Sequence, residues 1–278
     1  MRVRPHISPT LTRPWRHRAC AAFSLLELSV VIVIISVVAV MGLEGTAMYF
    51  DRVAYQVTQE RISVVDDAIA RYYRQFGTLP CPASQSLVQT DSCYGKGYRV
   101  NGGDQCASYA SACSANTTSG FRHGDVPVRD LNLPLHYMVD GYGNRLRYAA
   151  TSTMITSPAS FASATPAIEI RSGKQDATCG GAGNRCQKRA DAAYVVLSLG
   201  KGERGARPAD SINIKACLPT PTADYDGRID TVNCRFGNAT TLEYSVPLNV
   251  FYDSRYNVGD VEENYFDDVI RWRARKDL

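Results

Sequence analysis

The sequence predicts an α+β protein in which one long N-terminal helix packs on an antiparallel β-sheet head with disulfide-stapled loops. An apolar run at residues 23–43 continues into an amphipathic pattern that ends near Gly77. Short strand-like stretches follow, without the alternation of strands and helices that is typical of parallel sheets. Eight cysteines lie among the loops of this second part. We therefore divide the chain into an N-terminal segment (residues 1–22), an apolar helical segment (23–43), an amphipathic helical segment (44–77) and the head (78–278).

Residues 1–22 account for the net positive charge of the chain. They hold five of the 31 basic residues and no acidic one, so the remaining 26 basic residues nearly balance the 27 acidic ones. The rest of the chain therefore has no basic field of the kind that nucleic acid requires. The basic loop at residues 173–189 lacks the interleaved aromatic residues of a single-strand binder. We predict no nucleic-acid partner.

The apolar run from Phe23 to Leu43 contains one charged residue, Glu27. As a helix it is about 30 Å long, which matches the hydrocarbon core of a bilayer. The upstream arginines favour a cytoplasmic N-terminus, with the remainder of the chain outside. A removable secretory signal and a plain signal anchor are alternatives. Neither explains Glu27, because an ionisable group in a membrane segment is costly and implies a partner.

The N-terminal end of this run carries a recognisable motif, Ala22-Phe23-Ser24-Leu25-Leu26-Glu27-Leu28. It resembles the prepilin cleavage and methylation motif of type IV pilins and type II secretion pseudopilins. The resemblance implies cleavage by prepilin peptidase between Ala22 and Phe23, and methylation of the new amino group of Phe23. Glu27 then stands at the fifth mature position, where the family has its glutamate. Ala22 replaces the usual glycine, and the leader is longer than many.

The resemblance implies an assembly function. Glu27 would neutralise the N-terminal ammonium of a neighbouring subunit and set the axial register of a filament. The implied partners are other pilin or pseudopilin subunits, prepilin peptidase, the inner-membrane assembly platform and membrane lipid. The implied location is the bacterial inner membrane, with a single pass and a cytoplasmic N-terminus, and then a pilus or a periplasmic pseudopilus.

The size of the head bears on whether the chain is a minor or a major subunit. A head of residues 78–278 crowds a helical lattice, so we expect a minor pilin or minor pseudopilin. A major pilin is the alternative within the family. A signal-anchored periplasmic binding protein is the alternative from another class, and it gains nothing from Glu27.

The helical pattern continues beyond the apolar run. Apolar residues recur at spacings of three and four: Val53, Val57, Ile62, Val65, Ile69, Tyr72 and Phe76. Gly77 is a plausible end, and Pro80 and Pro82 exclude continuation. The sequence thus predicts one helix over residues 24–76 whose second half is amphipathic. Two helices broken around residues 42–45 are the alternative.

The head contains short strand-like stretches separated by polar loops. The predicted strands are Leu146–Ala150, Ala167–Arg171, Tyr194–Leu199 and Leu242–Pro247. Residues 265–273 read as a strand or a short helix, and residues 78–135, 172–192 and 200–241 as irregular connections. The segment Asp140–Tyr148 resembles the Asp-x-x-Gly-Asn turn and strand of pseudopilins, with Gly141 and Gly143 expected at positive φ. Residues 79–83 and 195–202 also resemble segments of pilin-like heads.

The cysteines indicate an oxidising compartment. Apart from Cys20, they are Cys81, Cys93, Cys106, Cys113, Cys179, Cys186, Cys217 and Cys234. An even number in a loop-rich region after a hydrophobic segment is typical of disulfides, although reduced thiols are the alternative. Neighbours along the chain are the preferred pairs: 106–113, 179–186 and 217–234, which leaves 81–93. Sequence alone does not fix this connectivity.

No enzyme site is predicted. After residue 22 only His123 and His136 remain, and both are expected at the surface or in turns. Hydrolase, zinc-protease and phosphate-loop motifs are absent from the sequence. The acidic segment Asp224–Asp230 has a loose likeness to calcium loops, and some pseudopilins bind calcium in a late loop, but it lacks the closing glutamate of an EF-hand. We expect a solvated turn there and no metal or cofactor, with calcium as the alternative.

Overall fold

The computed structural model describes residues 24–97, 120–175, 185–201, 205–215, 233, 250–254 and 266–278; within these ranges, side chains at 39–47, 173–175 and 185 are not described. The chain divides into two units between Met48 and Tyr49, and each is described by itself. The described elements are α1 (Leu25–Phe76), β1 (Phe121–Asp125), η3 (Leu135–Met138), β2 (Arg147–Thr151), α3 (Thr153–Thr156), α4 (Pro158–Ser163), β3 (Ile168–Gln175), β4 (Arg185–Ser198), β5 (Val250–Asp253), β6 (Val269–Ala274) and η7 (Arg275–Asp277).

Helix α1 is continuous, which confirms the prediction of one long helix and excludes a break around residues 42–45. It ends where the sequence predicts. Gly77 adopts a φ of 68°, and its N–H donates to the carbonyl oxygen of Tyr73 at 2.7 Å. A left-handed glycine is a common helix stop because it has no Cβ to clash.

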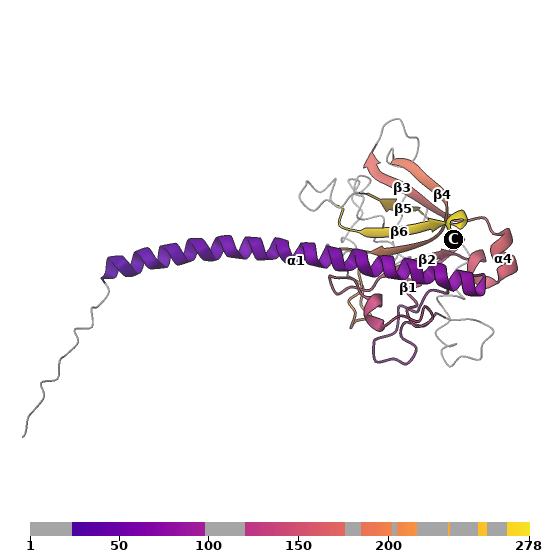
Figure 1. Ribbon diagram of the computed structural model, residues 1–278, viewed down its shortest axis with the longest axis horizontal. Coiled ribbons are helices and arrows are strands. Elements are labelled where there is room, and N and C mark those ends of the chain that lie inside the picture. Colours follow the sequence, from indigo (N-terminus) through magenta and orange to yellow (C-terminus); the bar gives the residue numbers. More distant parts are fainter. Residues whose placement is uncertain are drawn as a thin grey trace, which may run out of the picture. The chain divides into compact units, whose positions relative to one another are not determined.

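The sheet has six described strands in the order β1-β2-β4-β3-β5, with β6 added to β4 (Figure 1). Strand β4 is the longest, and at Ala192 it has partners on both edges, Ile168 of β3 and Ala274 of β6. The prediction of an antiparallel sheet is correct for four strand pairs. It is wrong for β3 and β5, which run parallel. Parallel strands need a long crossover, and about 75 residues separate these two in the chain.

The second half of α1 packs on one face of the sheet. Ile62, Val65 and Ile69 join a buried cluster with Tyr148 of β2 and Tyr194 of β4. The opposite face carries a second core that includes Phe121, Ile168, Ile170, Val195, Leu197 and Phe251. The predicted apolar stripe is thus confirmed in its middle. The two ends of the stripe are not buried, because Val53 and Phe76 are exposed.

Other strand predictions are confirmed in position but not in length. Strands β2, β3 and β4 overlap the predicted stretches, and residues 269–274 form a strand. Two predicted connections were partly wrong: β1 lies within residues 78–135, and β3 and β4 extend into residues 172–192 because they form one long hairpin pairing. The predicted strand Leu242–Pro247 lies outside the described residues.

Candidate functional site

The N-terminal end of α1 is built around Ser24 and Glu27. The hydroxyl oxygen of Ser24 accepts a hydrogen bond from the backbone N–H of Glu27 at 3.1 Å, and its carbonyl accepts from Leu28 at 3.1 Å. Ser24 is therefore the N-cap, and Glu27 is at the third helical position, as in the Ser-x-x-Glu capping pattern. A carboxylate in the first turn is also favoured by the helix dipole.

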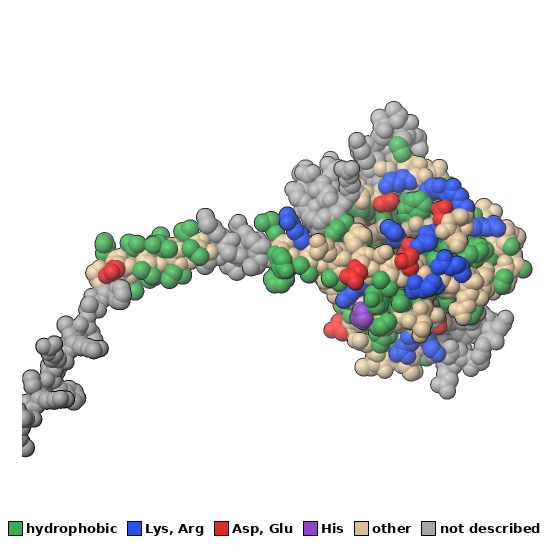
Figure 2. All heavy atoms as spheres, in the orientation of Figure 1, with side chains coloured by type: hydrophobic (Ala, Val, Ile, Leu, Met, Phe, Trp, Pro, Cys, Tyr) green, Lys and Arg blue, Asp and Glu red, His purple; other side chains and the backbone are tan. Residues whose placement is uncertain are grey.

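The surface around Glu27 is apolar on every side of the helix. Side chains from Leu25 to Val38 are exposed, and Leu25 and Leu26 are 87% and 77% accessible (Figure 2). The apolar run contains two serines, Ser29 and Ser36, whose hydroxyls are hydrogen-bonded within the helix. The hydroxyl of Ser29 donates to the carbonyl of Leu26, and that of Ser36 to the carbonyl of Ile32, each at 2.7 Å. Their polarity is satisfied inside the helix, so the exposed surface is suited to lipid or to other helices.

Glu27 is the exception on this surface. Within the part of the chain that the structure describes, its exposed carboxylate makes no hydrogen bond and no ion pair. If neighbouring helices or lipid cover the surface, an unpaired carboxylate becomes costly, and a cation from another molecule can offset that cost.

The two processing positions, Ala22 and Phe23, lie outside the described residues. The transmembrane prediction for residues 23–43 gains no support from the described residues, because none of their helices is long and apolar enough to cross a membrane.

The head part of α1 is fixed by the turn that follows Asp140. The guanidinium of Arg61 donates to the carbonyl of Val139 at 2.7 Å, and the hydroxyl of Thr58 accepts from the N–H of Gly141 at 2.9 Å. A Cβ on Gly141 would lie 2.0 Å from the carbonyl oxygen of Ala54. Gly141 is therefore required for close approach to the helix. The prediction of a positive φ is confirmed at Gly143, with φ 85°, and is wrong at Gly141.

The carboxylate of Asp140 organises this turn. One oxygen accepts from the backbone N–H groups of Tyr142 and Asn144 at 2.9 and 2.8 Å. The other accepts from the hydroxyl of Ser198 at 2.6 Å, which ties the turn to the end of β4. Burial raises the pKa of Asp140 to about 6, although these hydrogen bonds act in the opposite direction.

This raised pKa gives a testable pH dependence. A carboxyl group whose folded-state pKa exceeds its unfolded value stabilises the fold most below the unfolded pKa, near 3.8, and loses that contribution as the pH rises through about 6. We expect chemical denaturation to show about 1–3 kcal/mol less stability from this group at pH 7 than at pH 4. Asp140→Asn keeps the oxygen that accepts from Tyr142 and Asn144 but places an N–H₂ donor opposite the hydroxyl of Ser198, which must then accept. Because it removes the titrating group, this variant is expected to flatten the pH dependence. An unchanged pH slope in the variant would show that another group is responsible.

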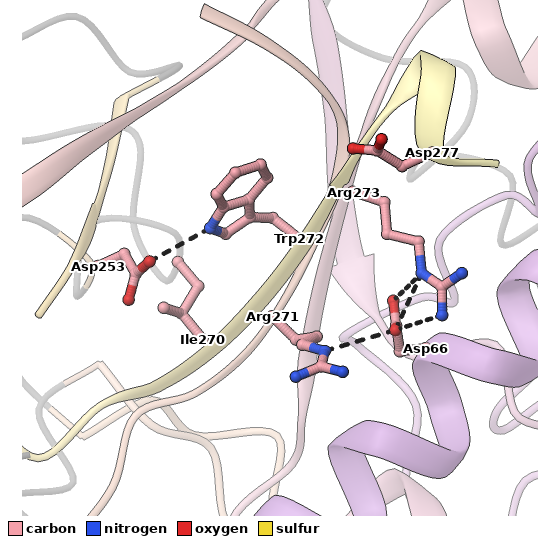
Figure 3. A pocket seen from close by; sticks show the side chains of 7 residues that line it. All are labelled: Asp66, Asp253, Ile270, Arg271, Trp272, Arg273 and Asp277. Atoms are coloured by element: carbon pink, nitrogen blue, oxygen red, sulfur yellow. Dashed lines mark hydrogen bonds and ion pairs between the residues drawn. The ribbon is translucent and has the colours of Figure 1, made fainter. Parts of the chain in front are cut away.

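A second carboxylate, Asp66, joins α1 to β6. Its side chain is 1% accessible and accepts from Arg273 at 2.7–3.1 Å (Figure 3). It also accepts from the hydroxyl of Tyr194 at 2.6 Å. Burial and the nearby carboxylate of Asp66 raise the pKa of Tyr194, so the phenol stays protonated and donates. Sequence reasoning did not single out Asp66, so its burial was missed.

The head also contains a buried cluster of charges on the neighbouring strands. Asp125 is fully buried and lies 3.1 Å from Arg145 and 3.4 Å from Arg147. Arg145 also donates to the carbonyl of Ser211 at 2.9 Å and lies over the ring of Tyr94. Burial lowers the pKa of Arg147 to about 10, so it remains charged at neutral pH. This cluster cross-links β1 and β2 to the following loops, which is a structural role.

Other sequence candidates are placed as follows. His136 is exposed, as predicted, but His123 lies in β1 and is partly buried, and burial and Arg147 lower its pKa to about 4. The prediction that His123 is a surface or turn residue was wrong because β1 was missed. Among the described residues, no cluster of metal-ligating side chains is present. The segment Asp224–Asp230 lies outside them.

The cysteines can be followed only in part. Cys81, Cys93 and Cys186 are disulfide-bonded. Because three is an odd number, at least one of their partners lies outside the described residues. Cys106, Cys113, Cys179, Cys217 and Cys234 lie there, and the predicted pairing stays a prediction.

Comparison with protein families gives a match at the N-terminus. Residues 17–43 match the prokaryotic N-terminal methylation motif, which is the hallmark of type IV pilins and pseudopilins and confirms the resemblance seen in the sequence. The motif covers the N-terminal end of α1 and the residues before it. Neither the curated proteins nor the solved structures contain a match.

Proposed function

We propose that this chain, whose N-terminus carries the methylation motif of type IV pilins and pseudopilins, is a minor pilin or minor pseudopilin. In this proposal, prepilin peptidase cleaves between Ala22 and Phe23, and the new amino group of Phe23 is methylated. The processed subunit then assembles with other subunits into a type IV pilus or a type II secretion pseudopilus. The observation that carries the proposal is Glu27, a carboxylate without a partner among the described residues, on a helix surface that is otherwise apolar.

Packing of α1 against other helices covers its exposed apolar side chains and gives Glu27 a cationic partner. Contact with neighbouring apolar helices removes the exposed leucine, valine and isoleucine side chains from water, which is favourable at about 25 cal/mol per Å² of apolar surface. The same contact buries Glu27. Cleavage before Phe23 creates an ammonium group that a neighbouring subunit can place against the carboxylate. The pair then favours one axial register over others.

The size of the head favours a minor subunit. Residues 78–278 form a large body to repeat at every position of a filament, whereas a tip or initiating subunit has room for it. A major pilin and a signal-anchored periplasmic binding protein are the competing functions. The proposal assigns the chain no catalytic site and no cofactor.

The stoichiometry of the chain in purified filaments tests this proposal. Filaments sheared from producing cells are quantified by mass spectrometry for this chain and for the most abundant subunit. We expect this chain at a small fraction of the abundant subunit, and only when prepilin peptidase is present. Equal amounts would instead identify a major pilin. Complete retention in the membrane fraction, with none in filaments, would contradict the proposal and favour an anchored binding protein.

A further inference from the structure

An exposed apolar patch lies on α1 where the helix reaches the head. Tyr49 and Phe50 are 65% and 67% accessible, and Val53 on the next turn is also exposed. Val53 stands four residues after Tyr49 and three after Phe50, so the three side chains lie on one side of the helix. Among the described residues from position 49 onward, the other exposed large apolar side chains are Phe76 and Ile212, which occur singly. The patch is therefore a local concentration of apolar surface.

The patch is on the side of α1 that points away from the head. Asp51 forms an ion pair with Lys201 at 2.5 Å, and a Cβ on Gly141 would lie 2.0 Å from the carbonyl oxygen of Ala54. Asp51 and Ala54, three positions apart, thus mark the side of the helix that rests on the head. Tyr49 stands two positions before Asp51, a rotation of about 200°, so it lies on the opposite side. The head therefore leaves the patch open to another molecule.

Arg52 adds a positive charge to this surface. It stands three residues after Tyr49, on the same side of the helix, and it is exposed. Within the part of the chain that the structure describes, neither its guanidinium nor the phenol of Tyr49 makes a hydrogen bond or an ion pair. We call Tyr49, Phe50, Arg52 and Val53 the 49–53 patch. It combines aromatic and aliphatic surface with a cation and a hydroxyl group.

The 49–53 patch is short along the helix axis. One turn beyond Val53 the same side of α1 is polar, because Gln56 and Glu60 are exposed there. From Tyr49 to Val53 the helix rises by about 6 Å. The headgroup layer on one side of a bilayer is about 5–8 Å thick, which is half the difference between the whole bilayer and its hydrocarbon core. A second helix needs an apolar stripe of several turns, so the length of the patch fits a headgroup layer better than a helix partner.

The position of the patch along α1 agrees with such a layer. As one continuous helix, α1 rises by about 36 Å from Leu25 to Tyr49, or by about 34 Å along the membrane normal at a tilt of about 20°. If the hydrocarbon core of about 30 Å begins at Leu25, Tyr49 lies about 4 Å beyond the core, inside the headgroup layer. Tyrosine and arginine are typical residues of this layer, because each joins an apolar body to a polar end.

We propose that the 49–53 patch binds the phospholipid headgroup layer on the non-cytoplasmic side of the membrane. In this arrangement Tyr49, Phe50 and Val53 contact the glycerol and upper acyl groups, and Arg52 pairs with a lipid phosphate. The patch then fixes the depth of α1 in the bilayer and holds the head close to the membrane surface. The inference rests on the membrane location in the proposed function. A second copy of the chain is the competing occupant.

Quenching of tryptophan emission by brominated lipids measures this depth. The natural tryptophans, Trp15 and Trp272, are replaced by phenylalanine, and Tyr49→Trp then reports from the patch. The full chain is reconstituted in phosphatidylcholine vesicles whose lipid is brominated near either the glycerol end or the methyl end of its acyl chains. We expect the lipid brominated near the glycerol end to cause the larger loss of emission.

Two matched probes make the possible failures distinguishable. Ile34→Trp, midway along the apolar segment, is expected to show the reverse order, and Phe76→Trp, at the far end of α1, is expected to show no quenching. Quenching of the Ile34→Trp probe without quenching of the Tyr49→Trp probe would overturn the inference and leave the membrane location intact. A blue-shifted but unquenched Tyr49→Trp probe would identify a second copy as the occupant. An unquenched Ile34→Trp probe would contradict the membrane location itself, and the inference with it.

The role of Arg52 has its own readout. With the Tyr49→Trp probe, the bromine is carried either by anionic phosphatidylglycerol or by phosphatidylcholine in an otherwise identical mixture. We expect the anionic lipid to be enriched about fivefold beside the probe, since one basic residue near an anionic surface contributes about 1 kcal/mol. Arg52→Gln is expected to remove this enrichment. Equal quenching by the two lipids before the substitution would overturn the assignment of Arg52 to a lipid phosphate.

Discussion

Replacement of Asp66 by alanine is expected to lower the free energy of unfolding of the head by about 3 kcal/mol. The carboxylate is buried and bonds to both Arg273 and Tyr194. Removing it leaves the buried phenol without its carboxylate acceptor and the partly buried guanidinium with Asp67 alone, and a broken buried pair typically costs about 3–5 kcal/mol. Arg273 is a quarter exposed and can turn toward water, so we expect the lower end of this range.

The adjacent residue supplies a matched control. Asp67 contacts the same arginine, at 3.0 Å, but its side chain is 61% exposed. Asp67→Ala is therefore expected to cost less than about 1 kcal/mol. Chemical denaturation of the full-length variants in detergent measures both. Equal losses for the two variants would show that burial of Asp66 is not what makes it important.

Replacement of Glu27 by alanine is expected to leave the amount of chain in the membrane fraction unchanged and to reduce its incorporation into filaments by more than about tenfold. Without the carboxylate, the ammonium of a neighbouring subunit is buried without a counter-ion. Loss of one partner from a buried pair costs about 3–5 kcal/mol, and about 1.4 kcal/mol already corresponds to a factor of ten. Quantification of the chain in membranes and in sheared filaments measures the two effects separately.

Two further variants distinguish the charge of Glu27 from its position in the capping pattern. Glu27→Gln keeps a polar side chain suited to the third helical position but removes the charge. Ser24→Ala removes the N-cap oxygen and keeps the charge. We expect Glu27→Gln to fail in assembly nearly as Glu27→Ala does, and Ser24→Ala to assemble. Normal incorporation of Glu27→Gln would show that the residue acts through the helix cap and not through an ion pair.

The elements set by local pattern could be predicted from the sequence. The spacing of Ile62, Val65 and Ile69 indicated the face of α1 that packs on the sheet, and Gly77 marked its end. The strands β2, β3 and β4 were indicated by their apolar residues. The N-terminal motif needed only residue type and spacing, and the family match at residues 17–43 confirms it.

The features set by distant partners could not be predicted. Strand β1 has the sequence Phe-Arg-His-Gly-Asp, which shows no apolar alternation. Its Asp125 is buried because it pairs with Arg147 of β2 and with Arg145, which precedes β2. The parallel pairing of β3 with β5 depends on a connection that local spacing does not encode. Asp66 did leave a signal, since it stands four residues after Ile62 and three before Ile69, on the apolar face of the helix.

The most direct test of the central claim is the N-terminal residue and intact mass of the chain, expressed with and without prepilin peptidase. The account predicts a chain that begins at Phe23 and carries one added methyl group, formed only when the peptidase is present. A chain that keeps Met1 in the presence of the peptidase, or that is cut after the apolar run, would contradict it.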